Sequence, residues 1–254
     1  MKKLLFLILC LCVSVAELFA QTEELNSVFE EANRLYLEQK YDAAISRYEA
    51  VIKNGYESGE VYFNLGNAYF KSGKLQNAIL NFERARKIIP NDDDVNFNLQ
   101  LANVQLIDKV ESIPELFIYQ WFNSLLTIFS LQTMVWLIYG LFLAVLGSFS
   151  VFLFTRRYET KRYSLMGGMI LSFFLIIGIA NFLIQSYRES NSEFAIVMTD
   201  VANIKSAPDN KGNDLFVIHR GIKVQMLDSV NKWNKIRLAD GKVGWIPEDQ
   251  VETI

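Results

Sequence analysis

One spacing constrains the N-terminal part of this chain more than any other feature: apolar and small residues recur there after 34 positions. The segment that starts at Phe29 aligns with the segment that starts at Phe63, and the register then holds for about twenty residues. The matched pairs are Leu35 with Tyr69, Tyr41 with Leu75, Ala44 with Ala78, Ile45 with Ile79, Tyr48 with Phe82 and Val51 with Ala85. A period of this length is typical of stacked helix pairs. The segment is therefore predicted to be an all-α solenoid that binds another protein rather than catalysing a reaction.

The second repeat, residues 59–92, resembles the tetratricopeptide (TPR) pattern. It carries, in order, Tyr62, Leu65, Gly66, Tyr69, Ala78, Phe82, Ala85 and Pro90. The first repeat, residues 25–58, departs from the pattern, because Glu31 stands where Leu65 stands and Tyr56 replaces the closing proline. A further helix with Val95, Leu99 and Ala102 on one stripe is expected to cover the second repeat. We assign residues 21–111 to TPR repeats plus this closing helix.

The TPR resemblance implies a concave groove lined by the first helix of each pair. Asparagines hold the positions that peptide-clamping TPR domains use for amides: Asn33, Asn64, Asn67 and Asn98. The cationic positions of those domains hold Phe29, Asp94 and Asn98 instead. The expectation is a groove that hydrogen-bonds an extended peptide backbone, with Phe29, Phe63 and Phe97 as apolar contacts. The alternative is that these side chains only stack the repeats or cap turns.

The first twenty residues have the layout of a secretory signal peptide. Lys2 and Lys3 precede an apolar segment, residues 4–16, and small residues follow it. Cleavage is expected after Ala16 or after Ala20, and Ala20 is preferred because sustained polarity begins at Gln21. Both cysteines, Cys10 and Cys12, lie in this segment. The mature chain is then expected to have no disulfide and no thiol nucleophile.

Apolar residues concentrate again in the middle of the chain. Residues 116–155 contain no charged residue and no histidine. As one helix they would extend about 60 Å, roughly twice the thickness of the hydrocarbon layer, so a break is required. We predict an interfacial helix at 112–132, a first transmembrane helix at 133–155, a short loop at 156–162 and a second transmembrane helix at 163–185.

The loop between these spans sets their direction. Arg156, Arg157, Lys161 and Arg162 lie within it, and short loops rich in Lys and Arg stay on the cytoplasmic side. Both flanking regions are then expected outside the cytoplasm, in the periplasmic or extracytoplasmic space of a bacterial cytoplasmic (inner) membrane. Gly140, Ala144 and Ser148 share one helix face, and Gly168 and Ser172 share another. Small residues at this spacing favour a tight hairpin, although chance occurrence explains them equally well.

The C-terminal residues, 194–254, change to short alternating runs separated by turn signals, which predicts strands. The runs are Phe194–Met198, Leu215–Ile218, Lys223–Leu227, Lys235–Leu238 and Val243–Ile246. The stretch from Asn203 to Pro208 and the Gly244-Trp245-Ile246 motif resemble bacterial SH3-like domains, which implies a small all-β barrel. Ala207 replaces a glycine of that pattern. Trp233 and Trp245 are candidates for a ligand surface that binds cell-wall peptides or other extended ligands. The alternative for Trp245 is a place in the barrel core.

The sequence gives no sign of catalysis. It has one histidine, His219, and no His/Cys cluster, Gly-rich phosphate loop or nucleophile motif. The run from Asp92 to Asp94 lacks the spacing of a calcium loop and is expected to cap a helix. We therefore expect no cofactor, no metal and no enzyme activity. A net charge of −3 gives no indication of nucleic-acid binding.

Taken together, the order of segments predicts a multidomain membrane protein. It resembles the BatE-like proteins of bacterial aerotolerance clusters, with local matches at Ala32–Tyr36, Asn64–Tyr69 and Pro90–Asp92. The resemblance implies a non-catalytic scaffold that works with membrane-bound von Willebrand-type Bat proteins in the envelope. The alternative is a wall-associated adaptor whose SH3-like domain binds peptidoglycan and whose TPR region recruits a wall enzyme.

Overall fold

The computed structural model describes residues 25–110, 116–191 and 193–254. The predicted signal peptide, residues 1–20, lies outside the described residues. The chain divides into two compact units. One combines the N-terminal helices with the C-terminal strands, and the other is the central segment, residues 113–192. Each unit is described by itself below.

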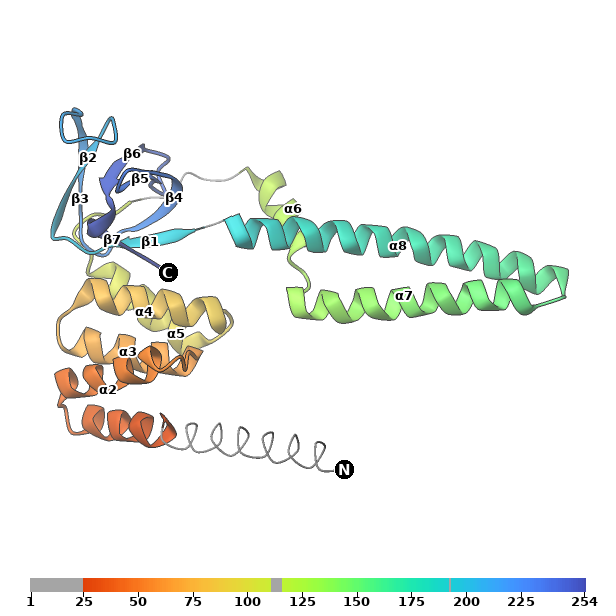
Figure 1. The fold of residues 1–254 in the computed structure, drawn as a ribbon, viewed down its shortest axis with the longest axis horizontal. Helices are drawn as coiled ribbons and strands as arrows, with labels where there is room; N and C mark the ends of the chain where they lie inside the picture. Colours follow the sequence, from red (N-terminus) through yellow and green to blue (C-terminus); the bar gives the residue numbers. More distant parts are fainter. Residues whose placement is uncertain (1–24, 111–115, 192) are drawn as a thin grey trace, which may run out of the picture. The chain divides into compact units, whose positions relative to one another are not determined.

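The N-terminal helices follow the predicted two-helix repeats (Figure 1). They cover residues 25–37, then Tyr41–Lys53 (α2), Gly59–Lys71 (α3), Leu75–Ile88 (α4) and Asp93–Val104 (α5). Two of them begin at a side-chain cap: the Ser58 hydroxyl accepts a hydrogen bond from the Val61 amide, and Asp92 caps α5 in the same way through the Val95 amide. These caps satisfy amides that a helix start otherwise leaves unpaired. The helical cap expected for the aspartate run is thus present.

Burial along the helices explains how they stack. In α2 the buried residues form one stripe, as expected for a helix with one covered face: Ala44, Ile45, Tyr48 and Val51. Gly66 in α3 lies against Phe82 in α4, so closely that an added Cβ would be 2.6 Å from the Phe82 ring. By contrast, α4 is buried around most of its circumference, from Ala78 to Glu83 and again at Ala85. Helix α4 must therefore be covered on more than one side.

The C-terminal residues form one antiparallel sheet of seven strands in the order β3-β2-β6-β5-β4-β1-β7. The strands are Phe194–Val197 (β1), Val201–Lys205 (β2), Asp214–His219 (β3), Lys223–Val230 (β4), Trp233–Arg237 (β5), Val243–Pro247 (β6) and Val251–Thr253 (β7). Alternate residues point inward, so β5 buries Asn234 and Ile236 while β6 buries Gly244 and Ile246. The sheet is consistent with the predicted SH3-like fold.

This sheet covers the outer side of α4 and completes its burial. Ile196 of β1 belongs to the same apolar cluster as Ile79 and Leu80 of α4. Gly221, in the turn before β4, has a φ of +89°, and a Cβ there would lie 2.5 Å from Leu106. Glycine meets both demands, the left-handed backbone and the close approach. The repeats and the barrel thus share a core, although 89 residues separate α5 from β1 in the sequence.

Polar contacts surround this shared core. Glu83 of α4, whose side chain is almost fully buried, accepts from Lys223 Nζ at 2.8 Å and from Arg86 at 2.5 Å. Arg84 reaches Glu252 of β7 at 3.0 Å. Asp108, after α5, accepts from the backbone amide of His219 at 2.7 Å. A buried carboxylate needs such partners, so these contacts fix the orientation of the barrel on α4.

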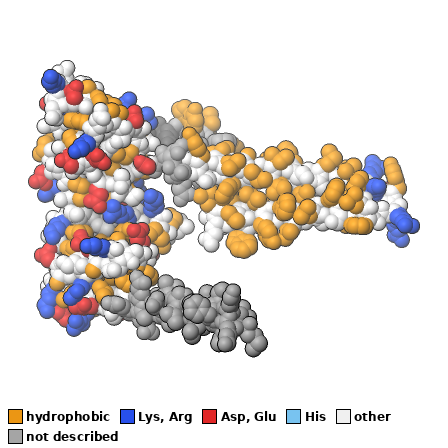
Figure 2. Space-filling view, viewed as in Figure 1, with side chains coloured by type: hydrophobic (Ala, Val, Ile, Leu, Met, Phe, Trp, Pro, Cys, Tyr) orange, Lys and Arg blue, Asp and Glu red, His pale blue; other side chains and the backbone are white. Residues whose placement is uncertain are grey.

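The central unit consists of Phe117–Leu126 (α6), Leu131–Phe154 (α7) and Tyr158–Asn191 (α8). Within it, α7 and α8 run side by side as a hairpin (Figure 1). Both carry segments that are long and apolar enough to cross a membrane, and their most apolar windows are not buried within the protein. Hydrophobic side chains are spread along the whole face of the hairpin seen in Figure 2, and Lys and Arg side chains gather at its tip. These features are those of a membrane protein.

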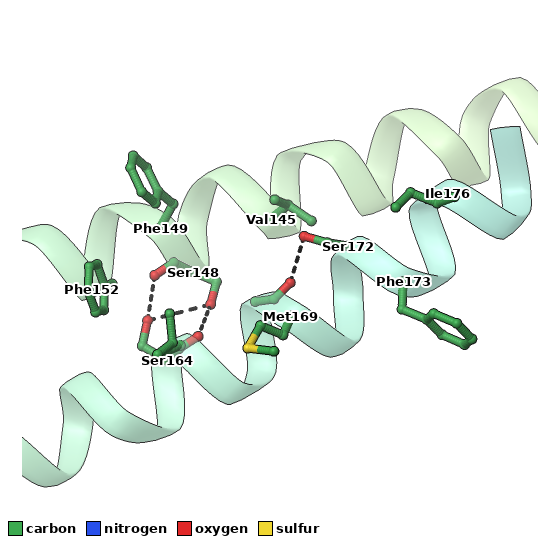
Figure 3. Close-up of a pocket in the computed structure, with 11 residues that line it drawn as sticks. Val145, Ser148, Phe149, Phe152, Ser164, Met169, Ser172, Phe173 and Ile176 are labelled. Atoms are coloured by element: carbon green, nitrogen blue, oxygen red, sulfur yellow. Dashed lines mark hydrogen bonds between the residues drawn. The ribbon is translucent and has the colours of Figure 1, made fainter.

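Small residues make the contact between α7 and α8. The hydroxyl of Ser148 donates to the Ser164 carbonyl at 2.7 Å, and the Ser164 hydroxyl donates back to the Ser148 carbonyl (Figure 3). Gly168 lies beside Ser148, while a Cβ on Gly140 would touch nothing within 4 Å. Of the small residues noted in the sequence, Ser148 and Gly168 lie at the contact and Gly140 does not.

The ends of the spans differ from the sequence-based ranges. Helix α8 begins at Tyr158, so most of the segment expected to be a loop, 156–162, is the first turns of a helix. Its basic residues remain at the tip of the hairpin. At the opposite end, Gln185 Nε2 donates to the backbone carbonyl of Leu126 and, at 2.9 Å, to the side-chain Oδ1 of Asn181. Asn181 thus bonds within its own helix, and Gln185 ties α8 to the end of α6.

Candidate binding surfaces

The four asparagines of the predicted groove connect successive first helices. Asn64 Nδ2 donates to Asn33 Oδ1 at 3.3 Å, and Asn98 Nδ2 donates to Asn67 Oδ1 at 2.8 Å. These pairs link the helix at residues 25–37 to α3, and α3 to α5. They therefore stack the repeats, which is the role that the alternative interpretation gave them. A carboxamide offers two N–H donors and two acceptor lone pairs, so half-buried amides with one such bond retain capacity for a ligand.

The Tyr48 phenol makes a further hydrogen bond to the pair formed by Asn33 and Asn64. Its hydroxyl donates to Asn33 Oδ1 at 2.7 Å. Burial raises the pKa of Tyr48, and the nearby Tyr36 adds to the effect. The phenol therefore stays neutral and remains a donor. With one acceptor lone pair of Asn33 directed at Tyr48 and another at Asn64, the orientation of the Asn33 amide is fixed.

The three phenylalanines of the predicted groove do not share one environment. Phe29 packs on Tyr48 with ring centroids 5.9 Å apart, and Phe63 packs on Phe82 at 6.1 Å. Both are half-buried and support the core. Phe97 is different, because 64% of its surface is exposed. The structure therefore leaves Phe97 as the phenylalanine most available to a partner.

Phe97 belongs to an apolar stripe that the sequence analysis missed. Leu101 and Val104 follow it at helical spacing on α5, with 43% and 67% of their surfaces exposed. We call these three residues the α5 stripe. The opposite side of α5 buries Val95, Leu99 and Ala102 against α4. The signal was present in the sequence as a second apolar series, and it was overlooked because the first series alone explains why α5 is a helix.

On the barrel, the two candidate tryptophans lie on the outer surface of neighbouring strands. Trp233 of β5 pairs with Pro247 of β6, and Trp245 pairs with Lys235. Neither side chain belongs to the buried core, so Trp245 does not take the core position that was considered for it. The Lys235 ammonium lies 5.9 Å from the Trp245 ring centroid, within the range of a cation–π contact.

Only one of the two tryptophans lines the cavity found on this side of the barrel. The cavity has a volume of about 630 Å³ and is formed by Trp233, Pro247 and the polar side chains of Asn210, Lys232, Glu248, Asp249 and Gln250. An aromatic wall with polar and charged groups around it suits a ligand that both stacks and hydrogen-bonds. The two tryptophans therefore have different surroundings: Trp233 lines the cavity, whereas Trp245 lies beside Lys235.

The described residues offer no metal site: no group of three or more His, Cys, Asp or Glu side chains among them could hold an ion. His219 is used in the contact between the repeats and the barrel. Its ring Nδ1 lies 3.0 Å from Asp108 Oδ1, and its backbone amide donates to the other oxygen of the same carboxylate. His219 therefore has a structural partner in Asp108.

Comparison with protein families identifies the two folded modules. Residues 29–93 match the model of a tetratricopeptide repeat. Residues 200–252 match the model of a bacterial SH3 domain. The chain therefore contains a TPR region and a bacterial SH3 domain, and the predicted fold class is confirmed: helical repeats, two long apolar helices and an antiparallel β module. Such modules are typically non-catalytic and bind proteins or peptidoglycan.

Proposed function

We propose that this protein is a membrane-anchored scaffold that holds protein partners through its TPR surface and its SH3-like domain. One observation carries the proposal. The barrel docks on α4, a second helix of a repeat, and the α5 stripe on a first helix stays exposed. An apolar stripe beside half-buried asparagine amides presents both an apolar contact and hydrogen-bonding groups, which is what an extended peptide needs.

The contact between the repeats and the barrel bears on the topology of the chain. Two regions that share a core must lie on the same side of a membrane. Two spans between them satisfy this requirement, whereas one span does not. The cations at the tip of the hairpin favour a cytoplasmic tip. We therefore propose that the TPR region and the SH3-like domain both lie on the extracytoplasmic side of a bacterial cytoplasmic membrane.

The proposed partners are membrane-bound envelope proteins. The order of segments in this chain resembles that of BatE-like proteins, which implies von Willebrand-type Bat partners and a role in aerotolerance. A scaffold of this kind needs its binding surfaces close to the membrane that carries its partners. The hairpin supplies this restriction, since it confines the folded unit to the membrane plane and raises the effective concentration of partners there.

The test is co-purification from native membranes with the full-length chain. Leu101→Asp places a charge in the middle of the α5 stripe, and Asn64→Ala with Asn67→Ala removes one amide from each asparagine pair. Both variants are expected to lose the membrane proteins that the wild type retains. Val217→Asp is the matched control, because it introduces the same charge at an exposed apolar position of the barrel. If the Leu101→Asp variant and the Asn64→Ala with Asn67→Ala variant both retain the same membrane proteins as the wild type, the proposal that the TPR surface binds these partners is wrong.

A second candidate function follows from the Trp233 cavity. In this case the SH3-like domain holds peptidoglycan and the TPR region recruits a wall enzyme. Sedimentation of the detergent-solubilised chain with purified cell wall tests this candidate. Retention that Trp233→Ala abolishes and Trp245→Ala preserves favours wall binding at the cavity. A wild-type chain that stays in the supernatant argues against it.

A further inference from the structure

A groove follows the contact between α7 and α8 in the part of the hairpin nearest its tip (Figure 3). Its volume is about 400 Å³, and it is lined by side chains between Val145 and Phe152 of α7 and between Ser164 and Ile176 of α8. At 1.5 Å per residue the α8 side extends about 18 Å, close to half of the roughly 30 Å hydrocarbon layer. We call it the hairpin groove, and its length matches the depth of one membrane leaflet.

The serine hydroxyls that line the hairpin groove are already used within the hairpin. Ser148 and Ser164 donate to each other's carbonyl groups, and Ser172 donates to the Gly168 carbonyl at 2.8 Å. A hydroxyl has one proton to donate, so none of these three serines offers a further donor. The groove therefore suits an apolar occupant along its length rather than a polar one.

The walls of the groove are bulky and exposed. Phe149, Met169 and Phe173 line it, and more than half of the surface of each is exposed. Helices associate in membranes through small residues and interhelical hydrogen bonds, and the hairpin uses both in its own contact, at Ser148 and Gly168. An unbranched thioether adapts to an irregular, flexible neighbour. The walls therefore favour a hydrocarbon chain over a third helix.

A cation lies at the tip end of the groove. Lys161 precedes Leu165, which lines the groove, by four residues, so both lie on the same face of α8. The Lys161 ammonium is 4.8 Å from the ring centroid of Phe152, which lines the groove from α7. A positive charge is therefore located where an acyl chain in the groove would join its headgroup.

Further cations surround Lys161 at the tip of the hairpin. Glu159 is the one acidic residue between positions 155 and 163, against four exposed basic residues: Arg156, Arg157, Lys161 and Arg162. Among the described residues, none of these four takes part in an ion pair. Basic clusters beside transmembrane helices bind the headgroups of anionic lipids. The tip is therefore complementary in charge to such a headgroup.

We propose that the hairpin groove binds an anionic phospholipid. One acyl chain lies along Phe149, Met169 and Phe173, and the headgroup phosphate pairs with Lys161 and the neighbouring cations. A zwitterionic phospholipid brings the same chains but adds an ammonium group that these cations repel. A free phosphate lacks the apolar part that fills the groove. The proposal requires only that the tip lies at a membrane surface, so it goes beyond the scaffold function and does not depend on it.

The experiment is native mass spectrometry of the full-length chain in detergent, titrated with each of three probes. The probes are phosphatidylglycerol, phosphatidylcholine with the same acyl chains, and glycerol 3-phosphate, which has no chains. Phosphatidylglycerol is expected to bind saturably and at least tenfold more tightly than phosphatidylcholine, and glycerol 3-phosphate is expected not to bind. Equal affinity for the two lipids overturns the proposal. A dimer that takes up no lipid assigns the groove to a second copy of the chain and also overturns it.

Variants at the cationic end test the headgroup contact. Lys161→Gln is expected to weaken phosphatidylglycerol binding about fivefold, the usual effect of one cation near an anionic headgroup, and to leave phosphatidylcholine binding unchanged. Lys161→Arg keeps the charge and should bind as the wild type does. Lys211→Gln is the charge-matched control, because it removes a cation from an exposed turn of the barrel. Wild-type affinity in Lys161→Gln overturns the proposal.

Variants in the wall test the place of the acyl chain. Met169→Gln puts an amide against the chain and is expected to weaken phosphatidylglycerol binding at least fivefold. Met166→Gln is the matched control, because Met166 is also exposed on α8 but does not line the groove. It should bind as the wild type does. Equal binding by the two variants overturns the proposal, and Lys161→Gln decides alone if Met169→Gln fails to fold.

Discussion

At the scale of single residues, the tightest constraint is the contact between Gly66 and Phe82. The Phe82 ring occupies the space that a side chain at position 66 would need, with ring atoms 2.6 and 2.7 Å from an added Cβ. Phe82 is itself completely buried. The ring therefore has little room to move, and the closeness of α3 to α4 depends on the missing Cβ.

We expect Gly66→Ala to destabilise the TPR region by about 1–3 kcal/mol, the usual cost of overpacking a core. The higher helix propensity of alanine acts in the opposite direction, by about 1 kcal/mol. The sign of the change in the free energy of unfolding therefore shows whether overpacking or helix propensity dominates. Chemical denaturation of the full-length chain measures it. In a Phe82→Leu background the smaller side chain relieves part of the overlap, and the cost of Gly66→Ala should fall. A stabilising Gly66→Ala in the wild-type background contradicts the packing seen here.

The phenols of Tyr48 and Tyr69 make a second prediction at this scale. Burial raises the pKa of both above the ordinary value of 10. A pKa that folding raises adds to the free energy of unfolding. This contribution is fully present below pH 10 and is lost at higher pH, because the phenols of the unfolded chain release their protons at a lower pH than those of the folded chain. Denaturation from pH 8 to 11 should show this loss. Tyr69→Phe should flatten the curve, and an unchanged curve would show that Tyr69 does not contribute to it.

Residue roles were the hardest feature to predict from the sequence. The asparagine series is visible in the repeat, but whether each amide faces a helix or a ligand depends on the neighbouring side chain. Asn33 illustrates this, because Tyr48 and Asn64 together fix its orientation. Asn81 illustrates the converse. Nothing in the sequence distinguishes it from a surface residue, yet only 3% of its surface is exposed in the folded protein.

At the scale of helices and strands, periodicity predicted most of the observed elements. The 34-residue period located the repeat helices, and alternation located β1, β3, β4, β5 and β6. It missed β7, Val251–Thr253, which has only three residues. Strand β2, Val201–Lys205, overlaps the Asn203–Pro208 stretch that was taken as a family motif rather than as a strand. Short strands give too few alternating positions for a pattern to be recognised.

The hairpin of α7 and α8 allows a direct test at this scale. Ser148 and Ser164 exchange hydrogen bonds across the two helices, so cysteines at these positions should form a disulfide under mild oxidation. With Cys10 and Cys12 changed to serine, no other thiol interferes. Gel mobility with and without reductant measures the bond. Ser150→Cys with Ser164→Cys is the control, because the Ser150 hydroxyl donates to Leu146 of its own helix. A disulfide in the control pair alone would show that the hairpin has a different register.

At the scale of the whole molecule, the topology is the property that most needs a measurement. We expect Thr160→Cys, at the tip of the hairpin, to be protected from a membrane-impermeant maleimide in intact spheroplasts. Glu57→Cys and Lys211→Cys, both exposed on the folded unit, should be labelled. Lysed spheroplasts, in which all three positions should react, serve as the control. Labelling at Thr160 without labelling at Glu57 and Lys211 would reverse the proposed orientation.

The docking of the barrel on α4 also has a consequence for biosynthesis. The repeats leave the ribosome first, and their α4 surface lacks its cover until the barrel arrives. A single inserted span would keep the barrel from that surface, whereas two inserted spans return the chain to the side from which it departed. A chain that inserts a single span would carry an uncovered α4 and a Glu83 that lacks its Lys223 partner, which a quality-control protease can recognise. Completion of this core thus reports correct insertion of the hairpin.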